Sequence, residues 1–250
     1  MTAVFPHALE RFRQEYGAHR AGEGRDHSGA ELLSLPYLKT GPLARQWAVR
    51  SRTFDAFMRH VVRPMGRAAR RPLRIVDLGA GNGWLSCRLS RAGHQCTAVD
   101  VREDAIDGLG AAGDLLRKTS FDCLVASFDN VPVATDSVDL AVFNASLHYS
   151  TDLPVTLAEA ARVVRSGGRI AILDSPFYAS EEDGRAMVAE KHAAAASRFG
   201  DRAESLLALP FIEFLTRERL EEASALLALR WRRRRIAYPL WYELRPLAAL

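Results

Sequence analysis

Lysine is scarce in this sequence: three of its 34 lysine and arginine residues are lysines, so 34 minus 3 leaves 31 arginines. The formal net charge of +4 is too small to indicate nucleic-acid binding by itself, because such binding needs cations gathered on one face. Hydrophobic residues make up 48% of the chain and charged residues 26%. This balance excludes intrinsic disorder and provides for a sizeable core.

Cysteine is also scarce, and histidine follows no recognisable pattern. Cys87, Cys96 and Cys123 are odd in number and stand among apolar or small residues, as buried free thiols do in a reducing compartment. The seven histidines show no metal-ligand spacing. We therefore expect no disulfide and no metal site.

Long apolar runs are missing as well. Nothing in the sequence approaches the roughly eighteen apolar residues that a membrane span needs. The first thirty residues carry scattered acids and no continuous apolar stretch, which argues against a secretory signal or transit peptide. These absences predict a cytoplasmic protein without a membrane span.

Residues 1–70 are patterned as helices. Trp47, Phe54, Met58 and Val61 recur at helical spacings, and Pro64 is expected to end their helix. We interpret this part as a helical extension that forms a lid over the following domain.

From residue 71 onward, strand-like and helical runs alternate. The predicted strands are 75–78, 96–100, 123–126, 138–144 and 169–174, with helices between several of them. Alternation of this kind predicts an α/β fold, with helices on both faces of a doubly wound parallel sheet, over residues 71–250.

Two later segments depart from this alternation. Residues 179–215 are helix-rich and predict an insertion after the fifth strand, followed by a helix that Thr216 caps. Two β-rich runs broken at Pro239 predict an antiparallel hairpin. The arginine run RWRRRR, residues 230–235, would then point into solvent at a sheet edge, far from the substrate mouth.

The segment IVDLGAGNGWLS, residues 75–86, leads a buried strand into a glycine turn and then a helix. Gly79 suits a turn that side chains disfavour, and Gly81 lets a ligand approach the backbone. The helix that begins near Trp84 presents free N–H groups to an anion. Trp84 occupies the position of the third glycine of a dinucleotide motif, and no Gly-Lys-Ser/Thr follows, so neither a dinucleotide fold nor a P-loop fits.

Two acids accompany this turn. Asp77 precedes Gly79 by two residues, where it could meet a ligand cation. Asp100 ends the strand CTAVD, and its carboxylate could accept two hydrogen bonds from a ribose diol beside the turn. A zwitterionic amino-acid end joined to adenosine describes S-adenosylmethionine.

The motifs VDLGAGNG, AVD, NVPVATDSVDLAVFNASLHY and AARVVRSGGRIAILD follow one another in this order over residues 71–175. In this respect the sequence resembles the class I S-adenosylmethionine-dependent methyltransferases, and within them the large group that acts mostly on small molecules. The resemblance implies a mostly parallel seven-stranded sheet whose last strand is antiparallel. It also implies S-adenosylmethionine as cofactor and S-adenosylhomocysteine as product.

The resemblance also assigns cofactor-binding roles by position. Asp77, Gly79 and Gly81 would hold the methionine end, Asp100 the ribose, Val101, Ser127 and Phe128 the adenine, and Asn144 would lie below the sulfonium. Many members have an aspartate at the position of Ser127, so this contact is weaker here or is made by Asp129 instead.

Methyl transfer from a sulfonium is an in-line displacement that depends on alignment and exclusion of water. His148 follows the fourth strand at the carboxyl edge and is the candidate general base. Tyr37, Tyr149 and Tyr178 are candidates for closing over the cofactor or holding the substrate.

These features favour methyl transfer to a small-molecule acceptor, and they leave open whether the accepting atom is oxygen, nitrogen, carbon or sulfur. One alternative is an RNA methyltransferase that grips the nucleic-acid backbone with the arginine run. FNASLHY after the fourth strand lacks an Asn-Pro-Pro-Tyr-like tetrapeptide, so base amino groups are not the expected acceptors. We do not expect nucleic acid as the partner, because the arginine run is interpreted as part of an edge hairpin that faces solvent. Another alternative, which Ser127 supports, is a protein that binds S-adenosylmethionine without catalysis.

Overall fold

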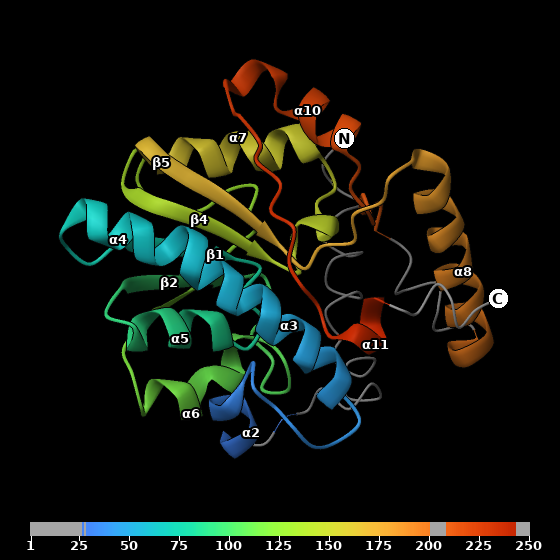
Figure 1. Ribbon diagram of the computed structural model, residues 1–250, viewed down its shortest axis with the longest axis horizontal. Helices are drawn as coiled ribbons and strands as arrows, with labels where there is room; N and C mark the ends of the chain where they lie inside the picture. Colours follow the sequence, from blue (N-terminus) through green and yellow to red (C-terminus); the bar gives the residue numbers. More distant parts are fainter. Residues whose placement is uncertain (1–26, 28, 201–208, 244–250) are drawn as a thin grey trace.

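The computed structural model describes residues 27, 29–200 and 209–243 as a helix-covered sheet (Figure 1). The elements that precede the sheet or lie within it in sequence are α2 (Gly29–Ser34), α3 (Ala44–Phe57), the π-turn η1 (Met58–Val62), α4 (Arg63–Ala69), β1 (Arg74–Leu78), α5 (Trp84–Arg91), β2 (Gln95–Asp100), η2 (Leu109–Ala112), α6 (Gly113–Leu116), β3 (Asp122–Val125), β4 (Val138–Asn144), η3 (Leu147–Tyr149), α7 (Leu153–Val163) and β5 (Val164–Leu173). The elements after β5 are α8 (Glu181–Phe199), α10 (Arg217–Ala223), η4 (Ala225–Leu227) and α11 (Leu240–Glu243).

The sheet has five strands in the order β3-β2-β1-β4-β5, and every neighbouring pair is parallel. The chain returns to the centre between β3 and β4, so β1 and β4 lie side by side with β1 in the middle. Asp77 of β1 stands opposite Ala98 of β2 and Val142 of β4. Parallel strands bring all their carboxyl ends to one edge, which is where ligands bind in open α/β sheets.

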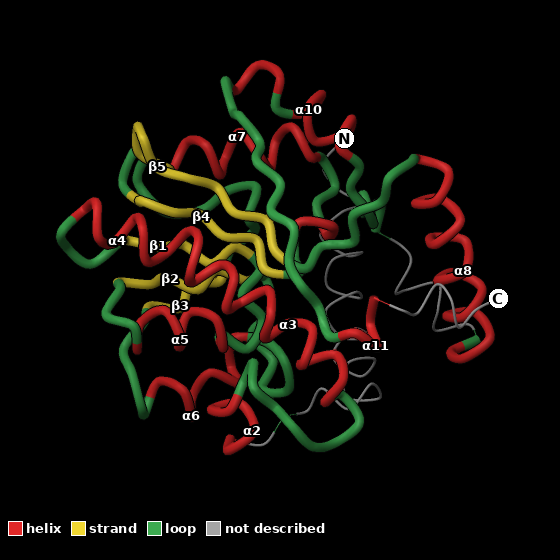
Figure 2. The backbone as a smooth tube through the Cα atoms, in the orientation of Figure 1, coloured by secondary structure: helices red, strands yellow, loops and turns green. Residues whose placement is uncertain are grey.

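Residue alternation divides the core between the two faces of the sheet. Ile75 packs in the cluster that contains the apolar residues of α3 and α5, whereas Val76 and Leu78 pack in the cluster that contains those of α7 and α10. Side chains of a strand alternate between the faces, so Asp77 lies on the α5 side with Ile75. Figure 2 shows the same layers, with helices on both faces of the strands.

The α/β class and the parallel sheet are confirmed, but the expected strand count and final hairpin are wrong. Within the described residues the sheet has five strands instead of seven, and its last strand, β5, is parallel to β4 instead of antiparallel. Residues 229–239 have no regular secondary structure. A strand through Arg232–Arg235 would send arginines to both faces of the sheet, including the face covered by helices, and this cost opposes pairing with β5.

Pro64 does not end the helix of the N-terminal segment, contrary to the expectation. The π-turn η1 lets the amide of Arg63 bond the carbonyl of Met58, and Pro64 then falls in the first turn of α4. A proline is tolerated there because its missing N–H would have no partner in the helix. The helical path therefore continues from Ala44 to Ala69 across the α5 side of the sheet.

A buried ion cluster ties the entrance of β1 to β4 and β5. The Asp139 side chain is 1% exposed and accepts two hydrogen bonds of 2.8 Å from Arg71, one of 2.8 Å from the Arg74 amide and one of 2.5 Å from Arg165. Burial alone would raise the pKa of Asp139, but these donors outweigh burial and hold it well below its usual range. The cluster joins the amino ends of three strands, opposite the edge where ligands would bind.

We expect Asp139→Asn to lower the free energy of unfolding by about 1–3 kcal/mol, since it weakens several charge-assisted hydrogen bonds at one buried acceptor. Urea denaturation at pH 7 measures the loss. Asp122→Asn on the exposed start of β3 is the matched control and should stay within about 0.5 kcal/mol of the native protein. Equal stability of the two variants would show that the cluster contributes nothing.

Candidate active site

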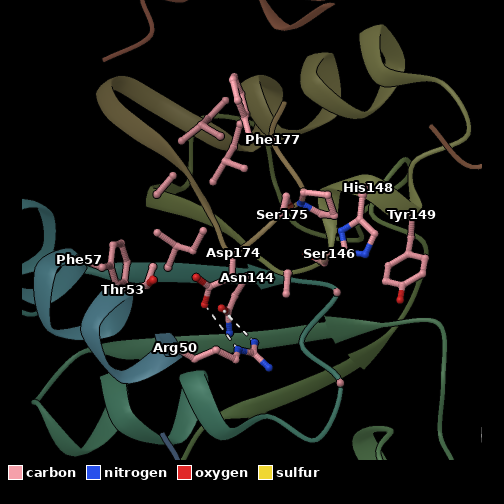
Figure 3. Close-up of a pocket in the computed structure, with 18 of the residues that line it drawn as sticks. Arg50, Thr53, Phe57, Asn144, Ser146, His148, Tyr149, Asp174, Ser175 and Phe177 are labelled. Atoms are coloured by element: carbon pink, nitrogen blue, oxygen red, sulfur yellow. Dashed lines mark hydrogen bonds and ion pairs between the residues drawn. The ribbon is translucent and has the colours of Figure 1, made fainter. Parts of the chain in front are cut away.

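A cavity of about 2550 Å³ opens at the carboxyl edge of the sheet. Its wall includes residues from the ends of β1, β2, β4 and β5, and also from α3 and from residues 229–238. Sites for one small ligand usually measure roughly 300–1,000 Å³, so this space can hold two small molecules together. Figure 3 shows Arg50 and Thr53 of α3 on one side and His148 and Tyr149 of the loop after β4 on the other.

The glycine turn after β1 contributes backbone to this wall. Gly79 and Gly81 have φ angles of +76° and +54°, which side chains disfavour, and both line the cavity. A Cβ atom on Gly79 would lie 2.4 Å from the Cβ of Ser146. The turn therefore requires glycine at position 79 for two independent reasons, conformation and space.

Asp100 ends β2 beside this turn, as the sequence predicts. Its two oxygens accept hydrogen bonds from the amides of Gly81 at 2.8 Å and Arg102 at 2.9 Å. Burial raises the pKa of Asp100, although these two amides oppose the shift. A carboxylate has lone pairs for about four bonds, so Asp100 can still accept two hydroxyl groups from the cavity.

Asp77 lies beneath the turn, outside the cavity wall. Its side chain is buried, with Oδ2 accepting a hydrogen bond of 3.0 Å from Ser86 and Oδ1 lacking a hydrogen-bond partner in the described structure. Burial raises the pKa of Asp77 to about 7. The expected direct contact of Asp77 with a ligand cation therefore stays a prediction, and the geometry favours action through the turn above it.

The residues expected around the adenine line the cavity together. Val101, Ser127 and Phe128 all contribute to the wall, and Asp129 lies beside them. Asp129 receives hydrogen bonds from Thr156 and from Ser127, the latter at 3.4 Å. Ser127 and Asp129 thus form one polar pair, so either can present an acceptor to a ligand amino group.

Two residues that the sequence interpretation missed join Asn144 at the centre of the cavity. Arg50 of α3 approaches Asp174, the residue after β5, at 3.5 Å and donates to Asn144 at 3.4 Å (Figure 3). The side chains of Arg50 and Asp174 are only 12% and 13% exposed. Burial raises the pKa of Asp174, and Arg50 opposes this shift.

The Arg50 guanidinium also stacks near two tryptophans. It lies 4.7 Å from the ring centre of Trp47 and 5.5 Å from that of Trp84, the first residue of α5. These contacts hold a cation next to the glycine turn. Asp174, like Asp100, stands where an apolar run of the sequence ends, so the sequence could have indicated it as a site residue. Arg50 belongs to no motif, and no sequence signal indicates it.

The predicted catalytic and substrate residues separate into two groups. His148, Tyr149 and Tyr178 line the cavity, with the rings of His148 and Tyr149 4.2 Å apart. Tyr37 lies outside the cavity wall, where its hydroxyl donates to Asp55 at 2.7 Å and Arg88 covers its ring. The structure therefore brings three of these four residues to one place.

Comparison with known proteins shows that part of this chain is similar to methyltransferases. Residues 76–172 match the family described as a methyltransferase domain. A malonyl-[acyl-carrier protein] O-methyltransferase of Erwinia pyrifoliae is 31% identical over 99 residues, which are 39% of this chain and 36% of that protein. An uncharacterised methyltransferase of Mycobacterium tuberculosis is 35% identical over 100 residues, which are 40% of this chain and 39% of that protein. The chain thus spans less than half the length of these curated relatives.

Among solved structures, the YcgJ protein of Bacillus subtilis matches 70% of this chain and 70% of its own with a TM-score of 0.51 and 19% identity, which shows a shared fold. The parallel sheet β3-β2-β1-β4-β5, together with the segments between its strands, includes the residues that match the methyltransferase domain family. Over residues 76–172 this chain is therefore similar to S-adenosylmethionine-dependent methyltransferases in sequence, and over a larger part it shares the fold of the Bacillus protein.

Two structural features are absent from the described ranges. No helix there has the length and apolar character to cross a bilayer. In the same ranges, histidine, cysteine and acidic side chains form no group of three suited to a metal ion.

We expect Gly79→Ala to destabilise the protein by at least about 1 kcal/mol more than Gly167→Ala, because only the former adds a steric clash. Gly167 is the matched control, since its φ of +74° is nearly the same and a Cβ there would meet nothing within 4 Å. Thermal and urea unfolding measure both variants. Equal losses would mean that the contact with Ser146 adjusts without cost.

The raised pKa of Asp77 gives a prediction with a definite sign. Its pKa is 3.8 without perturbation and about 7 when folded, so the folded state holds the proton more tightly. The contribution of this residue to stability therefore falls as the pH rises from about 4 to about 7 and stays low above that. Asp77→Asn keeps an acceptor for Ser86 without the charge, and should be more stable than the native protein at pH 8.

At pH 8 the free energy of unfolding of Asp77→Asn should exceed that of the native protein by more than about 1.4 kcal/mol, the equivalent of one pKa unit. This difference should disappear near pH 4. Urea denaturation of both proteins at pH 4, 6 and 8 measures it. Parallel stability curves for the two proteins across this range would contradict a raised pKa at position 77.

Proposed function

We propose that the protein transfers a methyl group from S-adenosylmethionine to a small-molecule acceptor. The observation that carries this proposal is the juxtaposition of the glycine turn and Asp100 on one wall of a large cavity at the carboxyl edge of the sheet. The turn offers backbone at close range and the carboxylate offers acceptors for a diol. This is the pairing that a nucleoside with a charged tail requires.

The chain's own residues fit the parts of S-adenosylmethionine. Gly79 and Gly81 accommodate the methionine end, and Arg50 supplies the cation for its carboxylate. Asp100 accepts the ribose hydroxyls. Val101 and Phe128 pack on the adenine, while Ser127 or Asp129 accepts its amino group. Asp77 supports the turn from beneath, and its unpartnered oxygen supplies negative potential there.

S-adenosylmethionine, when bound, supplies a methyl group activated by a sulfonium. Asn144 ends β4 and Asp174 follows the neighbouring strand β5, and the two residues orient the reacting groups between them. His148, on the opposite wall, accepts the proton of an acceptor whose nucleophile must lose one. Water is kept out by the residues of α3 on one side and by Phe211 and Tyr178 on the other.

The segments outside the sheet domain complete the cavity in this proposal. Within residues 1–70, α3 contributes Arg50 and Thr53, which fits the role of a lid for this extension. The insertion 179–215 contributes Leu209 and Phe211 to the cavity wall. Residues 1–26 and 28 of the extension and residues 201–208 of the insertion lie outside the described residues. The Erwinia relative is named as a malonyl-[acyl-carrier protein] O-methyltransferase, which supports an acceptor with a carboxyl group as one candidate class.

We expect S-adenosylmethionine and S-adenosylhomocysteine to bind with micromolar dissociation constants in calorimetric titration. Asp100→Asn should weaken both by roughly 10–100-fold, because one acceptor for the ribose hydroxyls is replaced by a donor. Asp122→Asn, on the exposed start of β3, should bind both like the native protein.

Circular dichroism must first show that Asp100→Asn is folded, because the carboxylate also holds the amide of Gly81. If the native protein binds neither compound, the proposed function is wrong. If it binds both but transfers no methyl group to any of a broad panel of small acceptors, the non-catalytic alternative holds.

A further inference from the structure

A run of arginines lies at the mouth of the cavity. Residues 229–239, called the strap below, include arginines at position 230 and positions 232–235, and residues 229–236 all line the cavity. Figure 2 shows the strap as a loop that runs from the α10 end of the molecule to α11. This position differs from the one expected for the run, at a solvent-facing hairpin far from the substrate mouth.

The strap is anchored at both ends. At its start, Nε1 of Trp231 donates to Oγ of Ser224 at 2.8 Å. At its end, the hydroxyl groups of Tyr238 and Thr53 lie 3.5 Å apart, and the Tyr238 amide donates to Glu243 at 3.1 Å. The four consecutive arginines are therefore held across the opening between two fixed points.

None of the strap arginines makes an ion pair within the described residues. Arg233 alone has an aromatic contact, 5.8 Å from the ring centre of Phe177. Nearby carboxylates on the cavity wall are already engaged, with Asp174 3.5 Å from Arg50 and Glu221 2.7 Å from Arg217. Within the described residues, the strap thus brings to the opening positive charge that no carboxylate pairs with, although Glu243 accepts from the Tyr238 amide at its far end.

Another part of the cavity wall has a different character. The end of β5 contributes Ile170, Ala171, Ile172 and Leu173, which are half-buried at the free edge of the sheet. An acceptor that lies between this wall and the strap meets an apolar surface on one side and cations on the other. The cavity therefore suits a molecule with an apolar body and an anionic group.

Neighbouring arginines repel one another, and a cleft with low-dielectric walls strengthens their combined field. A multiply charged anion relieves this repulsion, and the planar guanidinium matches phosphate oxygens with paired hydrogen bonds. We propose that the strap binds a phosphate or diphosphate group of the methyl acceptor. This inference rests on the proposed function and deepens it, since it names the acceptor as a phosphorylated small molecule with an apolar body.

The test uses inorganic pyrophosphate as the probe, titrated calorimetrically into the full-length protein saturated with S-adenosylhomocysteine. We expect micromolar binding that weakens as salt increases. Arg232→Gln/Arg234→Gln and Arg233→Gln/Arg235→Gln divide the run between two variants. Each should bind pyrophosphate at least about tenfold more weakly while binding S-adenosylhomocysteine as the native protein does.

Arg59→Gln/Arg63→Gln is the matched control, because these two exposed arginines of η1 and α4 lie outside the cavity wall. It should bind pyrophosphate normally. The proposal is overturned if pyrophosphate fails to bind, if both strap variants bind it as the control does, or if a single-stranded RNA of ten nucleotides binds more tightly through the same arginines. If S-adenosylhomocysteine fails to bind the native protein, the proposed function is overturned instead. The binding of pyrophosphate and the binding of S-adenosylhomocysteine are measured separately, so the two outcomes can be distinguished.

Discussion

The contact between Gly79 and Ser146 fixes how closely the turn after β1 approaches the loop after β4. The hydroxyl of Ser146 also donates to the carbonyl of Leu78, and the amide of Gly79 donates to the carbonyl of Val99 at 2.8 Å. These bonds hold the carboxyl ends of β1, β2 and β4 in one arrangement. Gly79, Ser146, Asp100 and Asn144 all line the cavity at this edge of the sheet.

Most of the sheet could be predicted from the sequence because its signals are local. Four of the five strands lie within one residue of the range that their apolar runs indicate, and Asp100 was correctly expected at the end of β2. The fifth strand, β5, begins at Val164, five residues before its expected start. The parallel arrangement follows from the alternation of strands and helices, and it brings the strand ends together without further information. The positions of Gly79, Gly81 and Asp100 on the cavity wall follow from the same reasoning.

The remaining wall depends on contacts between distant parts of the chain. Arg50 is one arginine among 31 and stands 94 residues from Asn144, so no spacing or motif marks it. The arginine run was expected in a hairpin because its flanks are β-rich and its charge suits an edge strand. That interpretation did not weigh the cost of sending consecutive arginines to both faces of a sheet, nor the anchors that Ser224 and Thr53 provide.

The two walls of the cavity come from opposite parts of the sequence, and this has a consequence for how the protein is made. Thr53 of α3 meets Tyr238, which the ribosome adds 185 residues later. The sheet and the glycine turn are complete by residue 173, so a nascent chain can fold the half of the cavity that we propose for the cofactor well before the strap emerges. A chain interrupted between these two points would lack the strap and with it the arginines at positions 230 and 232–235 of the cavity wall.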